Sequence, residues 1–446
     1  MIFEYLKEHM CNYTDSIIRD EERAMTYLEL LERAEELGKT LTYHKYGVLC
    51  SSELDAAIGV LACFYAGCTA VLLSARYGDK HNQNIMEHIK LPYLITESGI
   101  KTIGREVEET EDLSDVGLIL CTSGTTGRPK GAMITYENLR TNLEDINQYF
   151  AIRNTDRILI ARPLYHGAVL TGEFLISLIN GLDIVFINSG FAPVTILQAV
   201  RKYEITVFGA TPTIFYYLCG ILERKEERLS LKTVVISGEC MTEAAARRLQ
   251  NVLDYADVYH VYGLTEASPR VSYLPPEWFG KYPLSVGIPL KSVQVRLVDG
   301  ELQVRGKSIM KGYYHCDAAA VGVMKDGWLH TGDLAEIDAA GRITIKCRKD
   351  HMIIRAGMNI YPQEIENAIK QSGVVLEALA YGIREDTAGE KIGLKVVAVE
   401  GVSKQEIYTF CCKTLPSYQL PDRIDIVKEI PKNASGKVIR SVMGNG

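Results

Sequence analysis

The segment that most constrains this chain is residues 116–133, VGLILCTSGTTGRPKGAM. Residues 116–120 form an apolar run that predicts a buried strand, and small and hydroxyl side chains follow it directly. Glycines let backbone N–H groups converge on an anion, hydroxyl groups add donors, and one cation, Lys130, completes a cradle for a polyphosphate. The segment therefore predicts a phosphate-binding loop, with a flexible polar turn between strands as the simpler alternative.

This loop differs from the Walker A pattern G-x-x-x-x-G-K-[ST]. Counting from Gly124, the second glycine position holds Pro129, and Gly131 stands where a magnesium-binding Ser or Thr is required. A kinase-type P-loop NTPase is thus disfavoured, and hydrolysis of ATP to ADP rather than AMP would revive it.

The chain has 446 residues, of which 47% are hydrophobic, and a formal net charge of −7. This length predicts two or three domains with large cores, and the mild acidity argues against a nucleic-acid surface. We find neither an apolar segment suited to a membrane span nor a signal peptide. The 11 cysteines are scattered without a repeated spacing, which together with the missing signal peptide predicts reduced thiols and a cytoplasmic location. No clustered Cys and His residues suggest a zinc site.

Strands and helices alternate over most of the chain, which predicts an α/β fold with parallel sheets. The periodicity predicts helices over residues 25–40, 55–66, 136–149, 172–180 and 242–253. It predicts short apolar strands over residues 93–96, 157–161, 207–209, 233–237 and 258–261.

The pattern changes near residue 285. Residues 293–306 alternate with period 2 around Asp299-Gly300, and residues 327–346 do so around Ala340-Gly341, which predicts a small antiparallel β unit. A compact α+β segment with helices over 362–371 and 404–414 follows. We therefore predict a large N-terminal domain over residues 1–346, a hinge at 347–350 and a small mobile C-terminal domain over 351–446.

Three further stretches carry candidate ligand groups. In Tyr262-Gly263-Leu264-Thr265-Glu266, which follows a predicted strand, the ring can stack on a base and the carboxylate can hold Mg²⁺. Asp333 lies on a predicted hairpin, where it could accept two ribose hydroxyls, and Lys437 lies in a flexible turn. Taken singly these signals are weak, because the first could be a strand-end turn and Lys437 a solvated lysine.

Taken together and in this order, the motifs resemble the adenylate-forming superfamily, which comprises acyl-CoA synthetases, nonribosomal-peptide adenylation domains and luciferases. TSGTTGRPKG is similar to its phosphate loop, YGLTE to its adenine and magnesium motif, and GWLHTGDL to its ribose motif. KCRKDHMIIRAGMNIYPQEIE resembles its hinge, and PKNASGKVIR its catalytic-lysine motif. The resemblance covers nearly the whole chain.

The resemblance implies that ATP and a carboxylate give an acyl-adenylate and pyrophosphate, and that a thiol then takes the acyl group. Glu266 would coordinate Mg²⁺, Thr265 would contact the α-phosphate, and Lys437 would bridge the carboxylate and the α-phosphate. The other implied nucleotide ligands are Thr122, Ser123, Gly124, Thr125, Thr126, Gly127 and Lys130 at the phosphates, Tyr262, Gly238 and Glu239 at adenine, and Asp333 with Arg348 at the ribose.

The resemblance also implies that the C-terminal domain rotates about Asp350 between the two half-reactions. Lys437 would then leave, and a pantetheine thiol would enter beside Gly357. The hinge motif normally opens with Gly-Arg, whereas this chain has Cys347-Arg348. We expect the change to be tolerated, because the arginine and the aspartate are the acting residues.

The sequence Arg162-Pro163-Leu164-Tyr165-His166-Gly167 resembles the P-L-[FY]-H segment of acyl- and aryl-CoA ligases, in which the histidine borders the substrate carboxylate. Amino-acid-activating members carry an aspartate here for the α-amine, whereas this chain offers only Glu173, displaced from that place. This favours an aliphatic or aromatic acid without an α-ammonium group. Phe208 and Gly209 would form a wall and the opening of a mostly apolar pocket.

The leading hypothesis is an enzyme, an ATP- and Mg²⁺-dependent acid–thiol ligase that uses coenzyme A and a small-molecule carboxylate. The closest alternative is a stand-alone adenylation enzyme that loads the phosphopantetheine of an acyl or peptidyl carrier protein. A non-catalytic nucleotide-binding relative is disfavoured, because Lys130, Glu266, Asp333 and Lys437 are all present. No nucleic-acid partner is expected.

Overall fold

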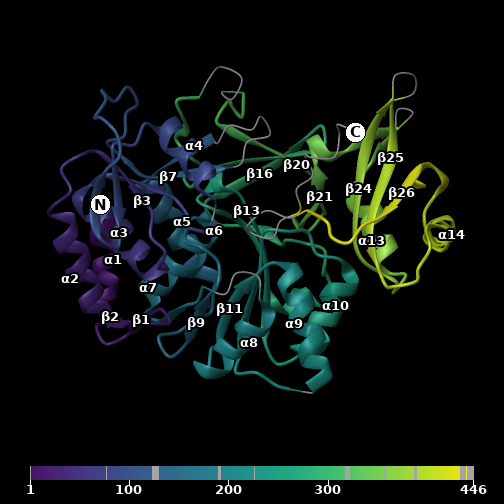
Figure 1. Cartoon of the computed structure of the whole chain (residues 1–446), viewed down its shortest axis with the longest axis horizontal. Coiled ribbons are helices and arrows are strands. Elements are labelled where there is room, and N and C mark those ends of the chain that lie inside the picture. The colour runs from purple at the N-terminus through teal and green to yellow at the C-terminus, as the bar shows by residue number, and fades with distance from the viewer. Residues whose placement is uncertain are drawn as a thin grey trace. The chain divides into compact units, whose positions relative to one another are not determined.

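The computed structural model describes residues 2–76, 78–122, 130–188, 192–225, 227–316, 322–355, 358–385 and 389–431, together with Val438. Contacts divide the chain into two compact units. Unit 1 comprises residues 1–241, 245–296 and 303–330, and unit 2 comprises residues 242–244, 297–302 and 331–446. Figure 1 labels the elements along the chain.

Unit 1 contains a nine-stranded sheet with the order β15-β14-β13-β12-β11-β9-β10-β1-β2. The run from β13 to β1 is parallel, and antiparallel pairs close both ends. The bounds are β1 (Ile17–Arg19), β2 (Ala24–Thr26), β9 (Arg157–Ile160), β10 (Asp183–Phe186), β11 (Val207–Ala210), β12 (Thr233–Ile236), β13 (Asp257–Gly263), β14 (Arg270–Leu274) and β15 (Ile288–Pro289). Short apolar strands suit this position, because helices cover both faces of a parallel sheet.

Three helices pack on these parallel strands: α8 (Pro193–Lys202), α9 (Pro212–Lys225) and α10 (Glu243–Val252) (Figure 1). Leu197, Phe215 and Leu249 of the helices share one buried core with Phe208 and Val234 of the strands. The predicted alternation of strand and helix is therefore confirmed, and it leaves the carboxyl ends of neighbouring strands at one edge of the sheet.

Unit 1 also contains a seven-stranded sheet with the order β18-β8-β7-β4-β3-β5-β6. Its strands are β3 (Lys45–Val48), β4 (Thr69–Leu72), β5 (Tyr93–Thr96), β6 (Gly99–Thr102), β7 (Val116–Thr122), β8 (Lys130–Thr135) and β18 (Gly312–Tyr314). The helices of this part of the chain are α1 (Ile2–Met10), α2 (Tyr27–Gly38), α3 (Glu53–Ala66), α4 (Asp79–Ile89), α5 (Tyr136–Tyr149), α6 (Gly167–Val169) and α7 (Ile176–Asn180). Helix α1 contacts α3, α5 and α7. Helix α3 is apolar nearly all round, and it is buried along most of its length.

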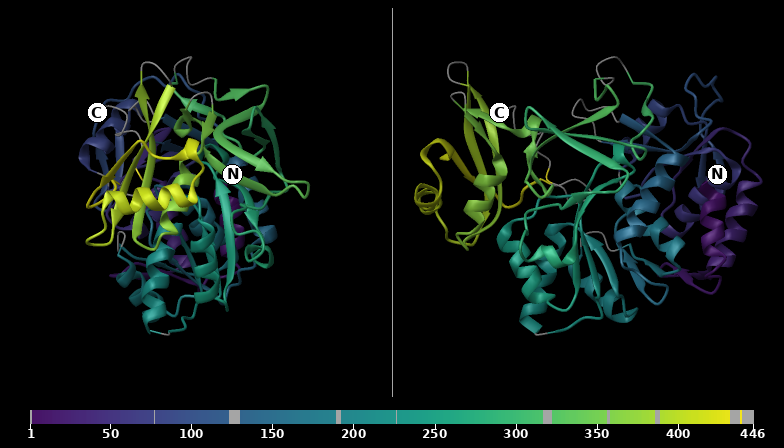
Figure 2. Two further views of the ribbon diagram at one scale, coloured as in Figure 1. Left: turned by 90° about the vertical axis from the view of Figure 1, so that its right-hand side faces the viewer. Right: turned by 180° about the vertical axis from the view of Figure 1, so that it is seen from behind.

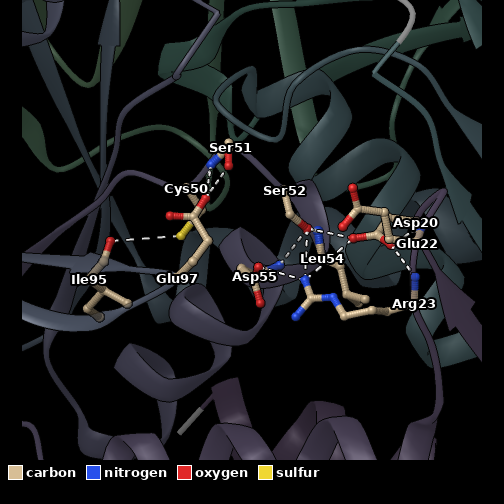
Figure 3. A network of polar contacts seen from close by, with 10 residues as sticks. All are labelled: Asp20, Glu22, Arg23, Cys50, Ser51, Ser52, Leu54, Asp55, Ile95 and Glu97. Atoms are coloured by element: carbon tan, nitrogen blue, oxygen red, sulfur yellow. Dashed lines mark hydrogen bonds and ion pairs between the residues drawn. The ribbon is translucent and has the colours of Figure 1, made fainter.

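A polar network ties the turn between β1 and β2 to the start of α3 (Figure 3). Arg23 donates hydrogen bonds to Asp55 at 2.6 Å and to Ser52 at 3.3 Å. Ser52 caps the N-terminus of α3 and donates to Asp20 at 2.8 Å. Because β1 belongs to the nine-stranded sheet and α3 contacts strands of the seven-stranded sheet, the network helps to join the two sheets of unit 1.

A five-stranded sheet has the order β16-β17-β20-β19, with β21 also paired to β20. Its strands are β16 (Val293–Val298), β17 (Glu301–Gly306), β19 (Met324–Lys325), β20 (Trp328–Ile337) and β21 (Ile343–Arg348), and β16, β17 and β20 contain residues of both units. This sheet confirms the predicted small antiparallel β unit with its turn at Ala340-Gly341.

The remainder of unit 2 is a second five-stranded sheet covered by two helices (Figure 2). Its elements are β22 (Ile353–Arg355), β23 (Met358–Ile360), α13 (Pro362–Lys370), β24 (Val375–Glu385), β25 (Gly389–Ala398), α14 (Lys404–Thr414) and β26 (Arg423–Ile426). Ile365 of α13 and Ile407 of α14 share one core with Ile392 and Leu394 of β25. The predicted compact α+β segment is confirmed.

Most predicted elements occur, with differences at their ends. Strand 93–96 and helices 136–149 and 404–414 have the predicted bounds. Helix 25–40 starts two residues late, at Tyr27, because Thr26 still belongs to β2 and caps the helix with its side chain. Helix 172–180 begins earlier, as the π-helix η1 (Leu170–Leu175). None of the helices in the described ranges has both the length and the apolar character needed to cross a membrane.

Candidate active site

The predicted phosphate-binding loop lies between two paired strands. β7 ends at Thr122 and β8 begins at Lys130, and these two residues face each other in the antiparallel pair. Lys130 Nζ lies 5.5 Å from the centre of the Tyr313 ring of β18. Of the predicted loop ligands, the side chain of Thr122 and the residues Ser123, Gly124, Thr125, Thr126 and Gly127 lie outside the described part of the chain.

The predicted magnesium ligand lies just beyond the carboxyl end of β13. Glu266 is in the short 3-10 helix η2 (Thr265–Ala267), together with Thr265. The backbone N–H of Met310 donates to its carbonyl oxygen at 2.8 Å, and the Tyr313 hydroxyl donates to its carboxylate Oε1 at 2.6 Å. The predicted metal carboxylate and the predicted phosphate cation, Lys130, therefore contact the same tyrosine.

The residues predicted to line the adenine pocket lie on neighbouring strand ends. β12 and β13 run parallel with Ile236 beside His260, so Gly238 and Tyr262, each two residues further on, lie at the same edge of the sheet, where Tyr262 still pairs with Ser272 of β14. Glu239 accepts a hydrogen bond from the Thr213 hydroxyl at 2.7 Å. Ligands of open α/β sheets bind at this edge, so the arrangement suits the predicted adenine contacts.

The loop that carries His166 is fixed to the seven-stranded sheet. The backbone N–H of Leu164 donates to the Glu53 carboxylate at 2.9 Å. The Tyr165 hydroxyl donates to the carbonyl oxygen of Cys121, also at 2.9 Å, next to the end of β7. The predicted substrate loop and the strand that leads into the phosphate loop are therefore in direct contact.

The charge state of His166 follows from its surroundings. Burial is the main cause that lowers its pKa to about 3, and the cations Arg162 and Arg76 act in the same direction. His166 is therefore neutral at physiological pH. In this state it can form hydrogen bonds to a substrate or shape the pocket, but it cannot supply a positive charge.

A buried ion pair lies beside the predicted acyl pocket. The Arg162 guanidinium contacts the Glu173 carboxylate of η1 and lies 3.3 Å from the Ser237 hydroxyl. Glu173 is only 3% exposed, and a Cβ added to Gly209 would lie 2.6 Å from its Oε1. Burial raises the pKa of Glu173, against the effect of Arg162. The predicted pocket opening at Gly209 thus faces a carboxylate that already has a cationic partner.

In unit 2, the structure brings together the two residues predicted to bind the ribose. Asp333 and Arg348 face each other across β20 and β21, and their Oδ1 and Nη1 atoms are 3.5 Å apart. Gly332 of β20 has a φ of +71°, which favours glycine, and an added Cβ would lie 2.8 Å from Arg348 Nη2. Arg348 Nε also donates to Asp350 at 3.4 Å. Gly357 and Lys437 lie outside the described residues.

The oxygen donors of Glu266 fit a magnesium ion that is bound together with a nucleotide. Within the described ranges, no group of three or more His, Cys, Asp or Glu side chains could hold a metal ion. Mg²⁺ commonly takes one or two carboxylates and completes its shell with water and substrate phosphates. A single carboxylate held by Tyr313 meets that requirement.

Sequence reasoning missed two features of this region. One is Tyr313, which contacts both Glu266 and Lys130, and the other is the pairing of Arg162 with Glu173. Gly312-Tyr313-Tyr314 carries no charge pattern, and nothing local indicates that it pairs with β8. Glu173 itself was identified from the sequence as the only carboxylate of its segment, but nothing local indicates that Arg162 is its partner.

The regions of this chain that are similar to known proteins contain the motifs described above. A family profile described as AMP-binding enzyme matches residues 100–314, and one described as AMP-binding enzyme C-terminal domain matches residues 364–437. A long-chain-fatty-acid–CoA ligase of Yersinia pestis is 30% identical over 90% of this chain and 72% of that protein. The chain belongs to the AMP-binding enzyme family.

Other relatives of this AMP-binding enzyme match along nearly its whole length. The 2-succinylbenzoate–CoA ligase of Bacillus velezensis is 29% identical over 94% of this chain and 93% of that protein. The o-succinylbenzoate CoA synthetase of Bacillus subtilis, solved with its acyl-adenylate intermediate, is 25% identical with a TM-score of 0.86, covering 99% of this chain and 98% of that one. The same synthetase solved with ATP and a magnesium ion is 26% identical with a TM-score of 0.85, covering 98% of both chains.

These comparisons confirm the predicted superfamily, the fold class and the enzyme class of AMP-forming acid–thiol ligases. The predicted cofactors ATP, Mg²⁺ and coenzyme A agree with the relatives' names and complexes. A carrier-protein acceptor has no support among them. The roles of individual residues and the boundary at 347–350 stay predictions.

Proposed function

We propose that this AMP-binding enzyme is an ATP- and Mg²⁺-dependent acid–coenzyme A ligase that acts on an aliphatic or aromatic carboxylate. The observation that carries the proposal is the contact of one side chain, Tyr313, with both Glu266 and Lys130. A carboxylate for magnesium and a cation for phosphates thus lie at one place, as binding of Mg²⁺ with ATP requires. Relatives named for 2-succinylbenzoate and for long-chain fatty acids support both kinds of acid.

The first half-reaction brings two anions together. An oxygen of the substrate carboxylate attacks the α-phosphorus of ATP, the bond to the β-phosphate oxygen breaks, and pyrophosphate leaves. A thiolate then attacks the acyl carbon, and AMP leaves. Charge neutralisation and in-line positioning are the main tasks in the first step, and Lys130, Thr265 and Lys437 are suited to them. Magnesium, when bound, supplies further positive charge at the phosphates.

We infer that the substrate lacks an α-ammonium group. The carboxylate nearest to the predicted pocket opening, Glu173, is already paired with Arg162. A substrate ammonium group would have to displace that arginine within a buried site, which is costly. The neutral His166 can border the reacting carboxylate without immobilising it in an ion pair. We also propose a cytoplasmic location, which the 11 cysteines, scattered without a repeated spacing, support.

We further propose that the chain works as a domain of residues 1–346 and a mobile domain of residues 351–446, joined by the hinge at 347–350. Asp350 would absorb the change in backbone angles during rotation. Asp350→Pro should spare adenylation and block thioester formation, because proline fixes φ. Unchanged overall turnover of that variant would refute the hinge assignment.

The proposal is tested by pyrophosphate release across a panel of fatty, aryl and amino acids, with and without coenzyme A. Release stimulated by coenzyme A, with an acyl-CoA product for a fatty or aryl acid, is the expected result. Release only with an amino acid, or without stimulation by coenzyme A, would contradict it and favour a carrier-protein acceptor.

The half-reactions give a second test. Lys437→Ala should lower adenylation by about 10²- to 10³-fold, by analogy with loss of a transition-state donor, and should leave thioester formation from a supplied acyl-adenylate largely intact. Lys413→Ala, which removes an exposed lysine of the same unit, is the matched control. Equal loss in both half-reactions would exclude the proposed role of Lys437.

A further inference from the structure

The segment from Met310 to Tyr314 runs beside both halves of the candidate phosphate site. Its strand β18 pairs with β8, with Tyr313 opposite Ala132. The backbone N–H of Met310 donates to the carbonyl of Glu266 at 2.8 Å, and that of Lys311 donates to the carbonyl of Met133 at 2.9 Å. Backbone hydrogen bonds therefore hold this segment against η2 on one side and against β8 on the other.

Tyr313 makes side-chain contacts on the same two sides. Its hydroxyl donates to Glu266 Oε1 at 2.6 Å, which is a short hydrogen bond to a charged acceptor. Its ring lies 5.5 Å from Lys130 Nζ, within the range of a cation–π contact. Main-chain bonds fix the backbone of β18, so a single side chain on a fixed strand contacts both Glu266 and Lys130.

These contacts involve Glu266, the proposed magnesium ligand, and Lys130, the proposed phosphate ligand. Hydrogen bonds from outside the metal shell orient a ligating carboxylate, and their loss commonly weakens metal binding 10- to 100-fold. An ordered lysine ammonium loses less side-chain entropy when a phosphate binds to it. The tyrosine hydroxyl is placed to orient the carboxylate of Glu266, and the ring is placed to order the ammonium group of Lys130.

We propose that Tyr313 is a positioning residue that orients Glu266 for magnesium and Lys130 for the phosphates of ATP, and so couples metal binding to nucleotide binding. This inference rests on the proposed function, in which Glu266 and Lys130 are ligands. It assigns separate tasks to two parts of one side chain, which substitutions can distinguish.

The test measures binding of α,β-methylene-ATP to the full-length protein by calorimetry, once with saturating Mg²⁺ and once with EDTA. In the wild type, Mg²⁺ should tighten binding by a measurable factor. Tyr313→Phe, which keeps the ring, should reduce that factor about 10-fold and change metal-free binding less than 3-fold. Tyr313→Leu, which also removes the ring, should weaken metal-free binding as well.

The matched control is Tyr314→Phe, on the next residue of the same strand. The Tyr314 hydroxyl also bonds to a carboxylate, Glu109, and not to the candidate site. Its removal should leave the effect of Mg²⁺ unchanged. A loss of the Mg²⁺ effect in Tyr314→Phe equal to that in Tyr313→Phe would mean that β18 has only a structural role, and would overturn the proposal.

A double-mutant cycle with Glu266→Gln shows whether Tyr313 acts through Glu266. In the Glu266→Gln background, Tyr313→Phe should produce no further loss of the Mg²⁺ effect. An equal loss in both backgrounds, or an unchanged Mg²⁺ effect in Tyr313→Phe alone, would overturn the inference. If the wild type itself shows no Mg²⁺-dependent nucleotide binding, the proposed function fails first.

Discussion

Tyr313 and Tyr314 are neighbours on β18 and point to opposite faces of their sheet, yet they have similar partners. Each hydroxyl donates to a glutamate, and each ring lies near a lysine ammonium group. They differ in burial. Tyr314 is 1% exposed, whereas Tyr313 is only partly buried and lies beside the candidate phosphate site.

The partners of Tyr314 form a cluster in which Lys45 is buried and the Glu109 side chain is 12% exposed. Lys45, which has no exposed surface, donates to Glu109 at 2.5 Å and to the Tyr314 hydroxyl at 2.6 Å. Burial alone would raise the pKa of Glu109, but the bonds from Lys45, the backbone and Tyr314 outweigh it and lower the pKa to about 2. Burial lowers the pKa of Lys45 and raises that of Tyr314.

Tyr313 and Tyr314 show that similar side chains with similar partners can have different roles. In the cluster of Lys45, Glu109 and Tyr314 the ammonium group and the carboxylate compensate each other, so removing one of them should lower stability. At Tyr313 the same kinds of group lie at the start of β8 and just after β13, and they are the groups that we propose as nucleotide and magnesium ligands. The substitutions below should therefore affect stability on one side of β18 and ligand binding on the other.

The largest effect on folding is expected from Lys45→Met. It leaves the Glu109 carboxylate without its cation, which should lower the free energy of unfolding by about 3 kcal/mol or more. Urea unfolding measures the change, and Lys101→Met, at an exposed position of β6, is the control. An effect within about 0.5 kcal/mol, the range of ordinary surface substitutions, would mean that the cluster is not stabilising.

Glu266→Gln should act on the other side of β18. Loss of the carboxylate charge should reduce pyrophosphate release by about 10²- to 10³-fold, comparable to loss of one transition-state donor. The free energy of unfolding should change little, because Glu266 is only partly buried. Retention of wild-type activity across Mg²⁺ concentrations would remove Glu266 from the metal site.

Tyr314→Phe should have a smaller effect on folding than Lys45→Met. It removes the hydrogen bond that the Tyr314 hydroxyl accepts from Lys45 and the one that it donates to Glu109, at an expected cost of about 1–3 kcal/mol in unfolding free energy. Nucleotide binding should stay at the wild-type value. Weaker nucleotide binding without loss of stability would reverse the distinction between the two tyrosines.

Glu109→Gln tests the ionisation of Glu109. Its effect on the pH dependence of stability should be small near neutral pH and clear in acid. The pKa of Glu109 is about 2 in the folded state and ordinarily 4.5, so its contribution to stability is complete above pH 4.5 and is lost as the pH falls towards 2. Unfolding midpoints at pH 5, 4 and 3 should fall less steeply in Glu109→Gln than in the wild type. Tyr313→Phe should keep the wild-type slope; parallel slopes in all three proteins would contradict the low pKa.

The sequence by itself determined the class of fold and the family. Apolar strands that alternate with amphipathic helices bury themselves as a parallel α/β sheet, so local periodicity was enough to find helices such as residues 136–149. The motifs around Lys130, Glu266 and Asp333 were readable because a nucleotide requires particular residue types in a short stretch. The position of Glu266 just after β13 followed from the same pattern.

Only the tertiary structure decided which residues meet. Tyr313 and Glu266 are 47 positions apart, Arg162 and Glu173 belong to different elements, and Lys45 and Tyr314 are 269 positions apart. Periodicity reports that a side chain is buried, but the partner depends on strand order, such as the pairing of β18 with β8. The free energy that selects one partner comes from long-range packing and charge compensation, which no local pattern in the sequence records.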